Sequence, residues 1–329
     1  MGSRSPTTAM TIVLGTMSFG EPGTREHPEI NTVDQAREVL DVFQSYGHSR
    51  LDTARTYGEG TTEGLLADVG WQDRGLRVDT KLFPSAGHPL ERGAGYTHSA
   101  ADVRRGLLDS LKALGADRVE TFFLHGPDRK HPFEETLEAV NSLRLEGRFE
   151  RFGLSNYPSW EVARICEICD KRGWPRPSVY EGHYNVLMRR TEDELFPCLR
   201  YYGMSFHVYS PLCSGFLTGQ YSRGVKVADI PNLHLRSLWN PLYFDGLDIL
   251  QAAAKKHSLT LPELCLRWLV HHSNLRQDLG DAILTGAATA QILDSNLQQF
   301  EKGPLPDDVV EAVDAAWFTV RAGAPKYWY

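Results

Sequence analysis

The stretch "VETFFLHGPDRKHPFEETLEAVNSLRLEGRFERFGLSN", residues 119–156, contains one complete strand–helix–strand unit. The apolar run 119–125 predicts a buried strand, and the amphipathic segment 133–147 predicts a helix. We expect this helix to stop at Gly147, because glycine readily adopts the left-handed conformation that ends many helices. A second strand is predicted at 149–156. The two strands should pair in parallel, because the helix returns the chain to the same end of the sheet.

The same unit repeats on both sides of this stretch. Further strands are predicted at 11–16, 50–54, 77–82, 178–184, 205–210 and 281–287, and helices at 32–47, 99–115, 159–173, 244–258, 261–274 and beyond about 306. An open doubly wound sheet and a closed barrel both fit this alternation. The total of eight strands favours the barrel, and so does the lack of a G-x-G-x-x-G motif after the first strand. The α/β chain is therefore predicted to form a (β/α)8 TIM barrel.

No linker rich in Pro and Gly divides the 329 residues. We therefore expect one domain over 1–329, with residues 1–10 flexible. The irregular segment 212–243 follows the seventh strand, which would make it a long loop on the face where barrel active sites lie. A last helix is expected before the aromatic tail.

Composition excludes several classes of protein. The net charge of −7 argues against a nucleic-acid partner, because phosphate binding needs clustered Lys and Arg. No apolar run is long enough to span a membrane, and the N-terminus lacks the apolar core of a signal peptide. Five scattered cysteines suit a reducing compartment, so a cytoplasmic location is expected. A small-molecule ligand is the remaining kind of partner, with a homodimer left open.

Four ionisable residues lie at or just after the carboxyl ends of three successive predicted strands. Asp52, Lys81 and His125 end their strands, and Tyr57 lies in the loop after Asp52. A charged Lys81 should lower the pKa of the Tyr57 phenol, while Asp52 holds the ammonium in place. His125 could donate a hydrogen bond to a substrate oxygen. Each residue alone is more often a turn cap or a packing residue, but together they indicate an acid site beside a carbonyl, without a metal.

The sequence resembles the aldo-keto reductases through "LGTMSFG" (14–20), "LDTARTYGEG" (51–60), "FFLHGPD" (122–128), "FGLSNY" (152–157) and "VYSPL" (208–212). Within that family it resembles the aflatoxin-aldehyde, or succinic semialdehyde, reductases through "DELFPCLRYYG" and "GLSNYPSWEVA". The resemblance implies a TIM barrel that binds NADPH without a Rossmann domain. It also implies that Tyr57 is the general acid, that Lys81 and Asp52 tune it, and that His125 orients the carbonyl.

The resemblance also implies a cofactor site. Ser155 and Asn156 would hold the nicotinamide carboxamide, and Tyr209 would stack on its ring. The expected cofactor-binding residues are Gly15, Thr16, Met17, Asp52, Ser155, Asn156, Glu181, Tyr209, Ser210, Pro211, Leu212, Ser214, Gln220, Gly286, Ala288 and Asn296. Glu181 stands where the family often has Gln.

Some of these positions depart from the family pattern. Gln220 replaces a Lys or Arg, and Ala288 and Ile292 stand where polar residues are common. Such losses weaken contacts to the adenosine phosphate. NADPH is still the cofactor that the resemblance implies, and the weakened contacts leave NADH open as an alternative. Arg223 or Arg236 of the long loop could compensate.

The residues expected at the substrate site also depart from the family pattern. The tail ends in "YWY" and lacks the Arg that can receive a substrate carboxylate. An aromatic or polyketide-like aldehyde, of the kind handled in secondary metabolism, would fit a pocket formed by Tyr57, His125, Trp239, Tyr243 and Tyr329. Two alternatives stay open: a dehydratase or cyclase that uses the acid site without hydride transfer, and a non-catalytic nicotinamide-binding regulatory subunit.

Overall fold

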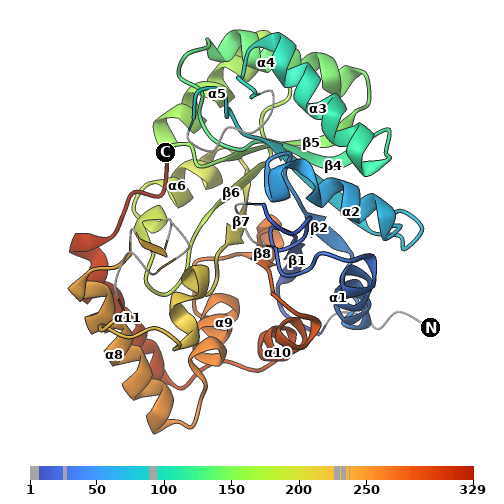
Figure 1. Ribbon diagram of the computed structural model, residues 1–329. Coiled ribbons are helices and arrows are strands. Elements are labelled where there is room, and N and C mark those ends of the chain that lie inside the picture. The colour runs from blue at the N-terminus through green and yellow to red at the C-terminus, as the bar shows by residue number, and fades with distance from the viewer. Residues whose placement is uncertain (1–6, 25–27, 89–94, 226–229, 231–234, 237) are drawn as a thin grey trace.

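A closed barrel of eight parallel strands forms the centre of the molecule (Figure 1). The computed structural model describes residues 7–24, 28–88, 95–225, 230, 235–236 and 238–329. The strands are β1 (Thr11–Gly15), β2 (Arg50–Asp52), β3 (Arg77–Leu82), β4 (Val119–Leu124), β5 (Phe149–Ser155), β6 (Val179–His183), β7 (Ser205–Tyr209) and β8 (Ala282–Thr285). They follow one another in chain order, and β1 closes the barrel against β8 through pairs such as Ile12 with Ile283. The predicted (β/α)8 barrel is confirmed, with strand ends that differ by one or two residues.

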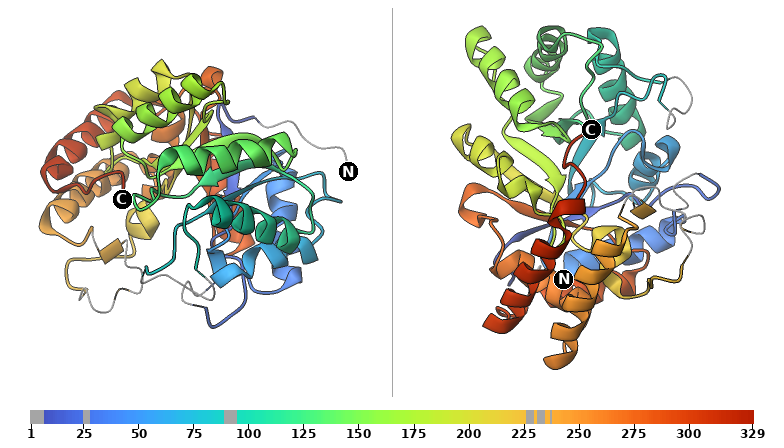
Figure 2. Two further views of the ribbon diagram at one scale, coloured as in Figure 1. Left: turned by 90° about the horizontal axis from the view of Figure 1, so that it is seen from above. Right: turned by 90° about the vertical axis from the view of Figure 1, so that its left-hand side faces the viewer.

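Helices surround the strands, as the two further views show (Figure 2). They are α1 (Val33–Ser45), α2 (Thr62–Asp68), α3 (Ala100–Leu114), α4 (Phe133–Leu145), α5 (Ser159–Arg172), α6 (Leu195–Tyr201), α8 (Pro241–Lys256), α9 (Leu261–His271), α10 (Ala290–Phe300) and α11 (Asp307–Val320). Their ends follow from local chemistry. The Ser99 side chain accepts the N–H of Asp102 to start α3, and Gly115 ends α3 at φ 63°. Gly147 and Gly173 are also left-handed, as predicted.

The segment after β7 is only partly described. It begins with a short 3-10 helix, η3 (Cys213–Thr218), and residues 226–229, 231–234 and 237 lie outside the described residues, as do residues 1–6 of the expected flexible N-terminus. α8 and α11 then run side by side outside the ring of helices (Figure 1). Among the described residues, no helix combines the length and the apolar character that crossing a bilayer requires.

The interior of the barrel carries two layers of polar side chains. In the lower layer, Arg50 Nε lies 2.7 Å from Asp79 Oδ2, and Arg50 Nη2 donates to Thr121. Side chains in a strand alternate between its two faces, so residues two positions further on point inward again. Two positions after Arg50 and Asp79 come Asp52 on β2 and Lys81 on β3, which form the upper layer. The register pairs Asp52 with Asp79 and thereby brings Lys81 one step nearer the carboxyl ends of the strands.

Gly153 is required by close packing between β4 and β5. A Cβ atom at this position would lie 2.3 Å from Phe123 Cδ1. We expect Gly153→Ala to lower the free energy of unfolding by about 1–3 kcal/mol, because the ring must leave its place in a filled core. Gly64→Ala in α2 is the control, since nothing lies within 4 Å of the added Cβ. Denaturant titration should show equal or greater stability for that control, and equal losses in both variants would contradict this explanation.

Candidate active site

The four predicted catalytic residues come together at the carboxyl end of the barrel. Lys81 Nζ lies 2.5 Å from Asp52 Oδ2 and 3.3 Å from the Tyr57 hydroxyl, and it donates to the carbonyl of Thr53 at 3.0 Å. The ring centroids of Tyr57 and His125 are 5.9 Å apart in an edge-to-face arrangement. The Lys81 side chain is fully buried, while Tyr57 and His125 are partly exposed. A buried charge therefore lies behind two side chains that face the mouth.

Local backbone structure places the phenol. Tyr57 opens the short 3-10 helix η1 (Tyr57–Gly60), and its N–H donates to the carbonyl of Ala54. The N–H of Arg55 donates to the carbonyl of Lys81, which ties the loop after β2 to β3. The loop that carries the phenol is thus hydrogen-bonded to the strand that carries the ammonium.

Lys81 is charged in this site. Burial alone would lower the pKa of its ammonium, but the nearby Asp52 carboxylate is the largest of the charges that outweigh burial and raise that pKa. The ammonium is therefore a permanent positive charge next to Tyr57.

The pKa of Tyr57 differs from the sequence-based expectation. Burial raises the pKa of the phenol, and although the charge of Lys81 lowers it, the net result lies above the ordinary value. The expectation of a lowered pKa was wrong because the cost of removing a phenolate from water exceeds the attraction of one ammonium. The phenol consequently keeps its proton at neutral pH, as a proton donor must.

His125 is neutral. Burial and the charge of Lys81 lower the pKa of its imidazole well below the ordinary value. Its backbone is held at both ends, since its N–H donates to the carbonyl of Leu82 and its carbonyl accepts from Asn156 Nδ2 at 2.9 Å. A neutral imidazole can donate one hydrogen bond to a ligand without adding charge.

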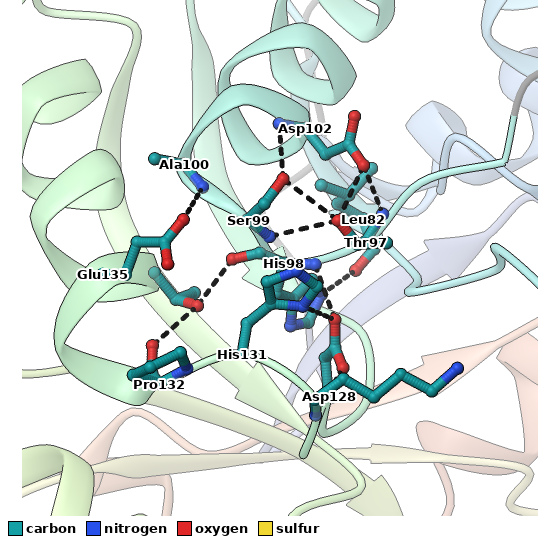
Figure 3. A network of polar contacts seen from close by, with 12 residues as sticks. Leu82, Thr97, His98, Ser99, Ala100, Asp102, Asp128, His131, Pro132 and Glu135 are labelled. Atoms are coloured by element: carbon teal, nitrogen blue, oxygen red, sulfur yellow. Dashed lines mark hydrogen bonds and ion pairs between the residues drawn. The ribbon is translucent and has the colours of Figure 1, made fainter.

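A buried polar network anchors the loop that follows His125 (Figure 3). Asp128 accepts from the backbone N–H of His98 and of Lys130, and lies 2.8 Å from His131 Nδ1. His98 Nε2 lies 3.3 Å from the carbonyl of Leu82, the same oxygen that the His125 N–H contacts. Burial lowers the pKa of His98 to about 4, so its imidazole is neutral at physiological pH. Sequence reasoning missed this network, which joins residues from two separate loops.

Residues predicted to hold a nicotinamide lie beside His125. Asn156 Nδ2 also contacts Ser155 Oγ at 3.0 Å, and Asn156 Oδ1 accepts from the Tyr209 hydroxyl at 2.8 Å. The ring of Tyr209 stacks on His183 with centroids 5.0 Å apart and planes 8° from parallel. His183 was not identified from the sequence. The structure thus brings Ser155, Asn156 and Tyr209 into one cluster.

The remaining predicted cofactor residues lie at or after the carboxyl ends of β1, β7 and β8, or in α10. Gly15 ends β1, the buried Thr16 donates to the carbonyl of Asp52, and Met17 is 50% exposed. Ser210, Pro211, Leu212 and Ser214 follow β7, and Gln220 is exposed beyond η3. Gly286 and Ala288 follow β8, and Asn296 is buried in α10.

Strained backbone gathers at this face of the barrel. Glu59, Asn156, Ser210, Cys213 and Ser214 have φ values between 53° and 64°, in the left-handed region that non-glycine residues avoid. All five follow the carboxyl end of a strand, whereas a sixth such residue, Ser258, follows α8. Such conformations cost about 1–3 kcal/mol each and concentrate at functional sites. The backbone independently indicates the same face as the side chains.

Arg223 and Arg236, the two arginines considered for contacts to the adenosine phosphate, each have other partners in this structure. Arg223 contacts Asp245 Oδ1 at 2.7 Å and Asp248 Oδ2 at 2.6 Å on α8. Arg236 donates to the carbonyl of Ile230 at 2.6 Å. Both already have partners in the long loop and α8.

The predicted substrate residues divide into two groups. Tyr329 packs edge-to-face on Phe83, which lies edge-to-face on His125, so the aromatic tail reaches the mouth. Trp239 packs with Phe216 in the long loop. The structure does not bring Tyr243 to the mouth, because its side chain is fully buried in α8 against Phe216.

A cavity of about 260 Å³ opens beside His88, on which Phe83 packs edge-to-face. It is lined by residues of the loops after β3 and β4, among them Pro84, His88, Tyr96 and Arg129. Phe83 was missed at the sequence level. It follows directly after β3, and an aromatic residue at that place could have been the signal.

Comparison with known proteins agrees with this geometry. The Aldo/keto reductase family model matches residues 11–317. The chain is 44% identical to the aldo-keto reductase pigE of Monascus ruber, with 100% of both proteins covered. It is 37% identical to aldo-keto reductase family 7 member A3 of Homo sapiens, covering 96% of each, and 37% identical to human aflatoxin B1 aldehyde reductase member 2, covering 99% of this chain and 91% of that protein. These relatives confirm the resemblance inferred from the motifs. The barrel, the tetrad at its mouth and the match over nearly the whole length show that this chain belongs to the aldo-keto reductase family.

Proposed function

We propose that the chain, as one domain over 1–329, reduces an aldehyde or ketone to an alcohol with NADPH. The observation that carries the proposal is Lys81 Nζ held between the Asp52 carboxylate and the Tyr57 hydroxyl at 2.5 and 3.3 Å. The family acts on carbonyl compounds. Its typical cofactor, NADPH, supplies a hydride to the carbonyl carbon.

The roles of the residues follow from their charges. His125, being neutral, donates a hydrogen bond to the carbonyl oxygen and orients it. Tyr57 gives its proton to the same oxygen as negative charge develops there, and the phenolate that remains is stabilised by the Lys81 ammonium. Asp52 keeps the ammonium charged and in place. One hydride and one proton then complete the alcohol.

The residues present fit a nicotinamide dinucleotide. Ser155 and Asn156 offer amide and hydroxyl groups to the carboxamide beside the partly exposed ring of Tyr209. Ser210 and Ser214 have left-handed backbone, a conformation that recurs in loops whose N–H groups bind phosphate. α10 begins with a Thr289 cap and has no acidic residue in its first turn, which suits the phosphate of NADPH.

We propose that the substrate is aromatic or polyketide-like, as in secondary metabolism. Phe83 and Tyr329 form an aromatic wall next to His125, and rings bind flat apolar substrates well. The five cysteines are unpaired, which suits the reducing cytoplasm.

A substrate panel tests this specificity. We expect kcat/KM for a bulky aromatic aldehyde to exceed that for succinic semialdehyde by about tenfold or more, because a pocket contact is worth about 1–3 kcal/mol. Tyr329→Ala should reduce this ratio, whereas Tyr201→Ala, an 82% exposed tyrosine on α6, should leave it unchanged. Preference for the semialdehyde would reject the proposed substrate class.

The reaction itself is tested with the purified protein. Aldehyde-dependent loss of the absorbance of NADPH, compared with NADH at equal concentration, measures both turnover and cofactor preference. Product formation that does not consume reduced nicotinamide would instead support the dehydratase or cyclase alternative. Binding of NADPH without any turnover would support the regulatory subunit.

A further inference from the structure

A second acid side chain lies in the centre of the site and has no part in the mechanism above. Glu181, on β6, places Oε1 at 3.4 Å from Lys81 Nζ. The side chains of Asp52 and Glu181 are each 3% exposed, and that of Lys81 is 0% exposed. Two carboxyl groups and one ammonium therefore share a site that water does not reach.

The three hydrogens of the ammonium are already used. Lys81 Nζ donates to Asp52 Oδ2 at 2.5 Å, to the carbonyl of Thr53 at 3.0 Å and to the Tyr57 hydroxyl at 3.3 Å. An ammonium has three N–H donors, so none is left for Glu181 at 3.4 Å. An ionised Glu181 would be a buried anion close to a cation that donates its hydrogen bonds to other groups.

One oxygen of each carboxyl group indicates that a proton is bound between Asp52 and Glu181. Asp52 Oδ1 and Glu181 Oε2 are both buried, and neither has a donor among the described residues. Both carboxyl groups approach the same nitrogen, Lys81 Nζ, at 2.5 and 3.4 Å, and hydrogen bonding between them acts to lower the pKa of Asp52 and to raise that of Glu181. Two ionised carboxylates are acceptors only and repel each other, so a contact of this kind requires a proton on one of them.

We propose that Glu181 is a neutral carboxylic acid that donates its proton to Asp52 and so leaves the Lys81 ammonium to Tyr57. Glu181 is then a positioning residue for the reaction proposed above. With the proton present, the net charge of Lys81, Asp52 and Glu181 is zero. Without it the net charge is −1, and a second negative charge on the Tyr57 oxygen would form next to an anionic cluster.

The surrounding charges agree with this assignment. Burial, followed by the charge of Asp52, raises the pKa of Glu181 well above its ordinary value, and Asp79 raises it further. Arg50 does not offset this, because its guanidinium is paired with Asp79 one layer below. On β7, the Tyr209 hydroxyl donates to Asn156, and His207 is in register with Glu181.

His207 does not supply a positive charge in place of Lys81. Burial and the charges of Arg50 and Arg151 lower the pKa of its imidazole well below the ordinary value, so it is neutral. Lys81 is then the cation that faces Glu181.

The sign of the pH effect follows from proton binding. A carboxyl group whose pKa is raised by folding holds a proton in the native state and has lost it in the unfolded state at the same pH. The native state is therefore progressively destabilised, relative to the unfolded state, as pH rises above the ordinary carboxyl range toward the folded pKa of Glu181. Glu181→Gln keeps a donor toward Asp52 but removes this ionisation.

The experiment compares wild type, Glu181→Gln and a matched control, Glu263→Gln. Glu263 is a largely buried acidic residue on α9 that pairs with Arg267 and Lys302. Unfolding by denaturant is followed between about pH 5 and 9, above the ordinary carboxyl range, where unfolding releases the proposed proton. We expect the stability advantage of Glu181→Gln over wild type to grow as pH rises, while Glu263→Gln keeps the wild-type pH dependence. A parallel dependence in all three proteins would overturn the proposal.

Infrared spectroscopy and the pH dependence of turnover test the same proposal. The infrared carbonyl band of a protonated carboxylic acid should be present in wild type at neutral pH, shifted in Glu181→Asp and absent in Glu181→Gln. In turnover assays, the alkaline limb of the pH–rate profile of Glu181→Gln should move to higher pH than that of wild type. Absence of this infrared band from wild type would contradict the proposal that Glu181 is protonated. Lack of turnover in wild type would reject the proposed reaction but leave the unfolding and infrared results to decide on Glu181.

Discussion

Replacing Tyr57 by Phe is expected to lower kcat for carbonyl reduction about 10²- to 10⁴-fold while cofactor affinity stays unchanged. The substitution removes only the hydroxyl, which lies 3.3 Å from Lys81 Nζ. The ring that packs edge-to-face on His125 is retained, so the shape of the site is preserved. Steady-state kinetics with an aromatic aldehyde and titration of the protein with NADPH measure the two quantities separately.

Tyr46→Phe is the matched control for this variant. The Tyr46 hydroxyl donates to Asp294 Oδ1 at 2.7 Å on the side of the molecule where the strands begin, so removing it costs a hydrogen bond but no chemistry. Its kcat should equal that of wild type. If Tyr57→Phe kept wild-type kcat, the phenol would not be the proton donor and the proposed mechanism would be wrong.

Replacing Lys81 by Met should abolish turnover and also lower the free energy of unfolding by about 3–5 kcal/mol near neutral pH. Lys81 is fully buried and holds Asp52 at 2.5 Å. Without the ammonium, the Asp52 carboxylate is left uncompensated in a site that excludes water. The loss should shrink as pH falls toward the ordinary carboxyl range, because proton uptake then neutralises Asp52. Denaturant titration at several pH values measures this dependence.

The double variant Lys81→Met/Asp52→Asn separates the two effects. Removing both charges should recover much of the stability, since no unpaired charge remains, while turnover stays low because Tyr57 has lost its cation. Recovery of turnover together with stability would show that Lys81 serves the fold alone. Equal instability of the single and double variants would show that packing around Lys81, rather than charge, is what matters.

Much of the barrel could be predicted from the sequence because its signals are local. Most strands are short runs rich in apolar, β-branched or aromatic residues, and each predicted helix shows a periodic apolar face. At Gly115, Gly147 and Gly173 the left-handed residue that ends a helix is itself a glycine. The short helix α6 was not identified, since seven residues give too few turns for a clear period. The long segment before α8 was predicted only as an irregular loop.

The candidate site was predictable where strand ends carried the signal, and less so elsewhere. Asp52, Lys81 and His125 could be placed at one mouth because parallel strands end on the same face. Tyr243 could not be placed, because the face of a helix that turns inward depends on what packs against it. The net pKa of Tyr57 could not be derived either, since it depends on how completely the surrounding atoms exclude water.

By itself the sequence determined the number and order of the strands and the chemical types at their ends, because these depend on residues close together in the chain. Only the tertiary structure decided how those residues share protons. Closing the barrel brings Glu181 from β6 to Lys81 on β3, and it leaves two carboxyl oxygens without a donor. Hydrogen-bond distances and burial arise from contacts across the barrel, and they determine which acid in this site is charged.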